Sequence, residues 1–197
     1  IKEYFANYFL HMSDVTFDMQ NNEMKVHRKS AEDWKVTLID TGIDTMTGGR
    51  LRRVADYLDP NQPFCFTYGD GLSDLNITQL VDYHKASGKL ATVTAVTPPG
   101  RYGALEIEFG AVKTFIEKPK GDGSKINGGF FVLSPKVIEL IDGDHTAWEA
   151  TPLERLAEMQ EINAFDHDGF WQPMDTLREK NMLQALWDKN KAPWKTW

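Results

Sequence analysis

A carboxylate held between two glycines is the feature of this sequence best suited to chemistry. Residues 64–71 read FCFTYGDG, so an apolar, β-prone run ends at Gly69-Asp70-Gly71. The run predicts a strand buried on both faces, and ligands of open α/β sheets bind beyond the ends of such strands. Glycine lets another molecule approach the backbone closely. An acid there suits a hydrated Mg²⁺ that carries phosphates, although an ordinary Asp-Gly turn explains the residues equally well.

A second acid, Asp175, stands where a loop is predicted to enter the last helix. Taken alone it is typical of an acid at a helix N-terminus. Mg²⁺ typically takes one or two carboxylates together with substrate phosphates. Asp70 and Asp175 are therefore a candidate metal pair, although the spacing by itself does not bring them together.

Positive charges suited to phosphate occur at two places. Lys118, in Glu117-Lys118-Pro119, is held at a strand end because Pro119 stops the ladder, and a compact ammonium suits a phosphate. A solvated Glu-Lys pair is the alternative. Arg50 follows two glycines at a predicted helix start, where backbone N–H groups favour anions.

Two further features have a structural and a functional explanation. Asn127-Gly128-Gly129 opens a predicted strand, either as a bulge or as bare backbone against a flat ligand. Trp171 fits the lining of a sugar site and fits the core equally well.

The composition is that of an ordinary globular chain of 197 residues with a net charge of −7. No dense Lys/Arg run is present, which argues against nucleic acid and acidic membranes as partners. Cys65 is the only cysteine, so an intrachain disulfide is excluded, and we expect it to be a small buried hydrophobe. No signal peptide or membrane-spanning run is visible, so a cytoplasmic location is expected.

Alternating helices and strands predict the α/β class, with a mostly parallel sheet flanked by helices and with added β-hairpins. The expected helices are an opening one with Ile1, Phe5, Tyr8 and Phe9 on one face, then 50–58, 76–87 with Asn76 as its cap and Gly88 at its end, one from Pro135, one from Thr151 with a Thr151–Glu154 capping box, and 176–190. The expected strands are 15–19, 24–26, 36–38, 64–68, 91–96, the hairpin 105–109 and 112–116, 127–133, and 163–166.

Taken together, these segments resemble the sugar-phosphate nucleotidylyltransferases, and most of all their glucose-1-phosphate cytidylyltransferase branch. The matching stretches are 41–53 (TGIDTMTGGRLRR), 68–71 (YGDG), 101–103 (RYG), 115–119 (FIEKP), 127–131 (NGGFF) and 169–176 (GFWQPMDT). The first of them indicates the cytidylyl branch.

The resemblance implies a Rossmann-like domain that converts CTP and glucose 1-phosphate into CDP-glucose and pyrophosphate, for dideoxyhexose synthesis in O-antigen and lipopolysaccharide. It also implies the residue roles. The implied roles are Mg²⁺ ligation by Asp70 and Asp175, nucleotide contact by Thr45, Arg50 and Gly69, sugar phosphate contact by Gly103, Glu117, Lys118 and Asn127, and catalysis by Lys118, Asp70 and Asp175.

One departure from the family is large. The signature loop G-G-x-G-T-R does not occur in these residues. We therefore expect a single nucleotidylyltransferase domain over 1–197 that is N-terminally incomplete, and no catalysis by these residues alone. A homo-oligomer is also expected.

Three other functions stay open. One is a nucleotidylyltransferase that uses UTP or dTTP. Another is a glycosyltransferase, which usually needs an Asp-x-Asp pair, whereas Asp70 and Asp74 are four residues apart here. The third is a non-catalytic regulatory or ligand-binding paralogue. Pyrophosphate release from CTP, with and without glucose 1-phosphate, separates a cytidylyltransferase from these alternatives.

Overall fold

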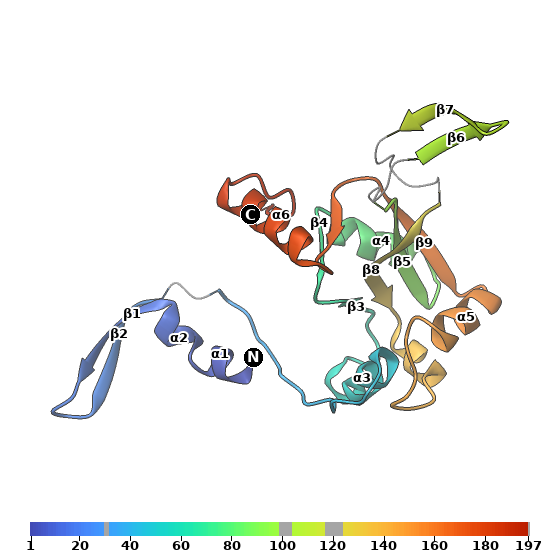
Figure 1. Cartoon of the computed structure of the whole chain (residues 1–197). Helices are drawn as coiled ribbons and strands as arrows, with labels where there is room; N and C mark the ends of the chain where they lie inside the picture. The colour runs from blue at the N-terminus through green and yellow to red at the C-terminus, as the bar shows by residue number, and fades with distance from the viewer. Residues whose placement is uncertain (30–31, 99–103, 117–123, 197) are drawn as a thin grey trace. The chain divides into compact units, whose positions relative to one another are not determined.

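The computed structural model describes residues 1–29, 32–98, 104–116 and 124–196 (Figure 1). Contacts divide the chain into two compact units, Ile1–Asp40 and Thr41–Trp197. The single domain over 1–197 therefore stays a prediction. Three of the predicted site residues, Gly103, Glu117 and Lys118, lie outside the described residues.

The first unit consists of two short helices and a β-hairpin. They are α1 (Lys2–Ala6), α2 (Tyr8–His11), β1 (Ser13–Asp18) and β2 (Glu23–Lys29), the last two antiparallel. The Asp18 carboxylate closes the hairpin turn by accepting from the amide of Gln20 at 3.0 Å. The hairpin was predicted, but the single opening helix is wrong. The helix breaks at Asn7, whose side-chain amide donates to the Glu3 carbonyl at 3.0 Å and competes with the helical backbone.

The predicted strand 36–38 is also wrong, since residues 32–46 contain neither helix nor strand. Val36 is exposed and has no partner strand there, and two apolar residues alone do not stabilise an extended segment.

The second unit carries the main sheet. Its elements are α3 (Thr47–Arg53), η1 (Ala55–Tyr57), β3 (Phe64–Thr67), β4 (Gly71–Ser73), α4 (Ile77–Ser87), β5 (Ala91–Val96), β6 (Ala104–Glu108), β7 (Ala111–Ile116), β8 (Ile126–Leu133), η2 (Pro135–Leu140), α5 (Thr151–Glu158), β9 (Ile162–His167), β10 (Trp171–Pro173) and α6 (Leu177–Asp188). Strands β6 and β7 form the second predicted hairpin.

Four strands pair in the order β3-β8-β5-β9. The fold class is confirmed as mixed α/β with helices beside a central sheet, but the expectation of a mostly parallel sheet is wrong. Among the described strands, β8 runs antiparallel to both neighbours, and only β5 with β9 is parallel. A central strand is apolar on both faces whichever way its neighbours run, so the hydrophobic pattern of 127–133 did not indicate direction.

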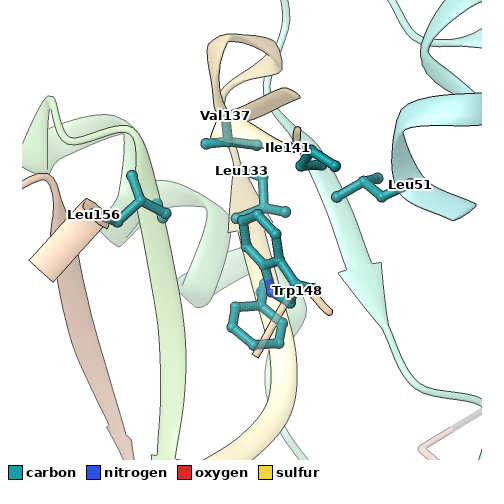
Figure 2. Close-up of a cluster of buried hydrophobic side chains, with 8 residues drawn as sticks. Leu51, Leu133, Val137, Ile141, Trp148 and Leu156 are labelled. Carbon is teal, nitrogen blue, oxygen red and sulfur yellow. The ribbon is translucent and has the colours of Figure 1, made fainter. Parts of the chain in front are cut away.

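The core lies against β3 and β8, and side chains of the segment 137–156, which follows β8, complete it. Trp148 is fully buried, and its ring meets Phe66 and Phe131 edge-on at centroid distances of 6.0 and 5.9 Å. Figure 2 shows Trp148 with other members of this cluster, among them Leu133. Packing of this kind fixes the position of the strands that end at the candidate site.

Cys65 is exposed, so the expectation of a buried thiol is wrong. Burial alternates along β3, with Phe64 and Phe66 partly buried and Cys65 and Thr67 exposed. In the part of the sheet that is described, β3 pairs only with β8 and lies at an edge. An edge strand covered on one side shows this alternation.

The helix starts expected near residues 76 and 176 are confirmed, whereas the capping box expected at Thr151 is not. The Asn76 side chain accepts from the Gln79 amide at 3.0 Å, and Gly88 closes α4 at a φ of 66°. Thr176 forms a full capping box at the start of α6. At α5 the helix already includes Thr151, with Ala150 as N-cap, so the expected Thr151 capping box is not formed. No helix in the described ranges is both long and apolar enough to span a membrane.

The pH dependence of stability tests how α4 packs on the sheet. His84 is buried, with Nδ1 3.0 Å from the Thr92 hydroxyl, and burial lowers the pKa of its imidazole below the ordinary 6.5. The folded chain therefore holds His84 neutral, and its contribution to stability is present above about pH 6.5 and lost as pH falls through the folded pKa. We expect urea unfolding to show a smaller fall in stability between about pH 7.5 and 5.5 in His84→Gln than in the unaltered protein. His27→Gln, at an exposed histidine, is the control, and equal pH slopes for all three proteins would contradict the expectation.

Candidate active site

A short antiparallel ladder brings Asp70 and Asp175 together. Asp70 directly precedes β4 and Asp175 follows β10, and Gly71 is paired with Pro173. The ladder continues past this pair, because the Met174 amide donates to the Asp70 carbonyl at 2.8 Å. The two acids therefore lie at the same end of the ladder and line one cavity of about 180 Å³. The other residues of its lining are Thr67, Tyr68, Gly71, Asn127, Gly128, Gly129, Trp171 and Pro173.

This pair fits a cation that takes most of its ligands from water and substrate. Both Asp70 and Asp175 are exposed, and a Cβ built on Gly69 would meet nothing within 4 Å. Within the described ranges no three His, Cys, Asp or Glu side chains gather as a ready-made metal cage. Two carboxylates with open space beside them are the arrangement that Mg²⁺ uses when phosphates complete its shell.

The start of β8 forms the wall of the cavity through a glycine bend. The Asn127 side chain accepts from the Gly129 amide at 2.8 Å, and Gly129 has a φ of 77°. A Cβ at Gly129 would lie 2.7 Å from the Tyr68 ring, and one at Gly128 would lie 2.8 Å from Val96. The β5–β8 register shifts at this point, so the bulge is confirmed. The bare backbone of this bulge also lines the cavity.

Two aromatic side chains border the same cavity. Trp171 is partly buried, and its indole Nε1 donates to the Gly128 carbonyl at 2.7 Å. Burial raises the pKa of the Tyr68 phenol well above its ordinary value, and the nearby carboxylates of Glu149 and Asp70 add to this rise. The phenol therefore keeps its proton. The sequence indicated Trp171 but not Tyr68, whose signal was its place directly before Gly69-Asp70-Gly71.

A second cavity, of about 310 Å³, adjoins the first at Thr67 and Tyr68. Arg50 lies on its wall and donates to the Thr41 hydroxyl at 2.7 Å and to the Ile43 carbonyl at 3.1 Å. Both acceptors are neutral, so these two contacts position the guanidinium without neutralising its charge.

The glycines before Arg50 serve close packing. Helix α3 begins at Thr47, so the expectation that Arg50 stands at a helix start is wrong. The Gly49 amide donates to the Thr146 carbonyl at 3.1 Å, which occupies one of the N-terminal donors expected to attract an anion. A Cβ on Gly48 would lie 2.7 Å from that carbonyl. Close packing and anion binding need the same missing side chains, so the glycine pair in the sequence does not distinguish between them.

The predicted site residues therefore fall into three groups. Asp70, Asp175 and Asn127 line the first cavity, with Gly69 beside Asp70. Arg50 lies on the second cavity, and Thr45 is 7% exposed and packs against Gly42 and Gly49. Gly103, Glu117 and Lys118 lie outside the described residues.

Comparison with known proteins identifies the class. The family model for nucleotidyl transferases matches residues 7–179, and the chain belongs to this family. The glucose-1-phosphate cytidylyltransferase of Salmonella typhi is 64% identical over 197 residues, which are 100% of this chain and 77% of that protein. The probable glucose-1-phosphate cytidylyltransferase of Bacillus subtilis is 40% identical over 198 residues, with the same coverage of 100% and 77%.

A solved structure shares the fold. It is a putative glucose-1-phosphate thymidylyltransferase from Bacillus anthracis in complex with a sucrose, similar with a TM-score of 0.52 at 18% identity. The match covers 77% of this chain and 63% of that one. At this identity the likeness concerns the arrangement of helices and strands.

Substitution of two glycines tests the geometry of the cavity wall. Gly129→Ala is expected to lower the free energy of unfolding by at least 1–2 kcal/mol, roughly the cost of a left-handed backbone in a residue with a Cβ, with the Tyr68 contact adding to it. Gly69→Ala is the matched control, since its Cβ meets open space, and its stability should change by less than about 0.5 kcal/mol. Urea unfolding measures both, and equal stability of the two variants would contradict the described bend.

Proposed function

We propose that the protein transfers a cytidylyl group from CTP to glucose 1-phosphate and releases pyrophosphate. The observation that carries the proposal is the placement of Asp70 and Asp175 at one end of the β4–β10 ladder, on a shared cavity. The chain that carries this pair is 64% identical to a glucose-1-phosphate cytidylyltransferase over its whole length.

The reaction needs positioning and charge neutralisation more than acid-base chemistry. The phosphate oxygen of glucose 1-phosphate is already anionic, so it attacks the α-phosphorus of CTP without a general base. The bond from the α-phosphorus to the bridging oxygen breaks in line with this attack, and pyrophosphate leaves. Holding two anionic substrates in this geometry is the main task of the protein.

Asp70 and Asp175 would hold a divalent cation, which nucleotidyltransferases of this family generally use. We propose Mg²⁺, because both ligands are carboxylates and the space beside Gly69 leaves room for water and phosphate oxygens. When bound, Mg²⁺ supplies positive charge that stabilises the phosphate oxygens in the transition state.

The remaining roles follow the resemblance. Gly69 and Arg50 would contact the nucleotide, and the Arg50 guanidinium is available because its described acceptors are neutral. Thr45, also proposed on the nucleotide side, would act by supporting α3. The glucose 1-phosphate would be held by four residues. They are Gly103, Glu117, Lys118 and Asn127, of which Asn127 lines the cavity of the acids.

The choice of base is the finer part of the proposal. CTP is favoured over UTP or dTTP by the relatives at 64% and 40% identity, which are both cytidylyltransferases by name. Assay of the full-length protein with glucose 1-phosphate and each nucleotide in turn tests the base, with CDP-glucose as the expected product.

A homo-oligomeric state and a cytoplasmic location are also proposed.

The carboxylate pair is tested by removing one negative charge at a time. Asp70→Asn or Asp175→Asn in the full-length protein is expected to lower kcat/KM by about 100-fold or more, because the cation loses a charged ligand. The readout is pyrophosphate release with CTP, glucose 1-phosphate and saturating Mg²⁺. Asp142→Asn, at a carboxylate paired with Arg155 away from the cavity, is the control. Near-normal activity of either active-site variant would refute the metal pair.

Lys118→Ala tests whether Lys118 contacts glucose 1-phosphate and not CTP. If Lys118 contacts the sugar phosphate, the variant should bind glucose 1-phosphate roughly 10- to 100-fold more weakly and CTP nearly unchanged, since a charge-assisted contact contributes roughly 1.5–3 kcal/mol. Calorimetry measures both affinities in the full-length protein. Lys113→Ala, on the exposed β6–β7 hairpin, is the matched control. An equal loss for both substrates would instead assign Lys118 a structural role.

A further inference from the structure

The ladder that carries both acids needs support from outside itself. Strands β4 and β10 have three residues each and pair only with each other among the described strands. Pro173 offers no N–H to the ladder. An isolated two-stranded ribbon is marginally stable at best. The spacing of Asp70 and Asp175 therefore depends on whatever fixes β4 against β10.

A polar cluster closes the end of the ladder opposite to the acids. Asp74 follows β4, and its Oδ1 accepts from the Phe170 amide at 2.8 Å. The Asp74 amide in turn donates to the Phe170 carbonyl at 3.2 Å. The same Oδ1 lies 3.0 Å from Nε2 of His167. Asp74 therefore joins the two strands and links both to a histidine.

The hydrogen-bond partners of His167 determine which of its ring nitrogens carries the proton. The Ser73 hydroxyl donates to the Phe170 carbonyl at 2.8 Å, which uses its single hydrogen. His167 Nε2 lies 3.0 Å from that hydroxyl oxygen and 3.2 Å from the same carbonyl. All its neighbours in this cluster then act as acceptors, so Nε2 carries the hydrogen. His167 is the last residue of β9 and is paired with Val96, so the cluster fastens the ladder to the main sheet.

Glycine at position 169 makes room for the Asp74–His167 pair. A Cβ on Gly169 would lie 2.4 Å from Asp74 Oδ1 and 2.6 Å from Cε1 of His167. Glycine at 169 thus lets the loop between β9 and β10 fold directly over the two side chains. The side chains of Asp74 and His167 are only 33% and 12% exposed, which strengthens their interaction relative to a surface pair.

We propose that Asp74 and His167 are positioning residues for the reaction. They hold β4 in register with β10, so that Asp70 and Asp175 stand at the separation at which they share one cation. This inference rests on the proposed function, since it concerns the cation of that site. Loss of groups that orient metal ligands typically costs 10- to 100-fold in metal affinity.

Mn²⁺ alone is the probe, and its binding to the full-length protein is followed by electron paramagnetic resonance without any substrate. We expect Asp74→Ala and His167→Ala to bind Mn²⁺ roughly 10- to 100-fold more weakly. Asp74→Asn keeps an acceptor for the Phe170 amide and should stay within about threefold of the unaltered protein. Asp142→Ala breaks a partly exposed ion pair with Arg155 elsewhere and should leave the affinity unchanged.

Kinetics provides a second readout. In Asp74→Ala, kcat at fixed Mg²⁺ should fall and recover in part at higher Mg²⁺, with the KM for glucose 1-phosphate within about threefold of the unaltered value, since the sugar contacts are elsewhere. If Asp74→Ala does not fold, Ser73→Ala removes a single hydroxyl of the cluster and should still weaken Mn²⁺ binding about threefold or more.

The possible failures are distinguishable. If the unaltered protein binds Mn²⁺ in an Asp70-dependent way and Asp74→Ala binds it equally well, the positioning role alone is overturned. The same conclusion follows if Asp74→Asn is as weak as Asp74→Ala, or if Asp142→Ala is weakened as much. If the unaltered protein shows no Asp70-dependent Mn²⁺ binding, the proposed metal site is overturned together with this inference.

Discussion

The hydrogen bond from the Met174 amide to the Asp70 carbonyl, 2.8 Å long, is the contact on which the candidate site depends. It extends the three-residue β4–β10 ladder and places two acids that are far apart in sequence at one end of the ladder, on one cavity. Like charges repel, so the chain stabilises this arrangement with backbone bonds and the Asp74–His167 contacts at the other end. A divalent cation relieves the repulsion, which is why such a pair suits metal binding.

Strand β8 holds the β4–β10 ladder in position, because its backbone contacts a side chain of β10. The carbonyl of Gly128 accepts from the Trp171 indole, and Gly129 leaves room for the Tyr68 ring. Both glycines lie in the bulge where the β5–β8 register shifts. Beyond the bulge, β8 becomes fully buried at Phe131 and packs on Trp148. The same strand thus contributes bare backbone to the cavity and apolar side chains to the core.

Local chemistry was predictable from the sequence where a residue type has one dominant use. Asn76 and Gly88 defined α4, and residue type made Asp70 and Asp175 a candidate pair, but only the structure shows that both line one cavity. Properties set by distant partners were not predictable. The direction of β8 and the exposure of Cys65 depend on which strands lie beside them. The Asp74–His167 pair had no signal beyond Gly169, because neither residue follows a recognisable pattern.

The segment around Arg50 shows how a family motif combines structural and functional demands. Gly48 and Gly49 allow α3 to dock against residues 144–146, and that docking sets where Arg50 emerges. The two cavities meet at Thr67 and Tyr68, with the carboxylates on one and the guanidinium on the other. A ligand that carries phosphates across this junction would face a cation held by Asp70 and Asp175 at one end and Arg50 at the other. A nucleoside triphosphate needs positive charge along its whole phosphate chain, and in the proposed reaction the protein supplies it from two elements that the core holds together.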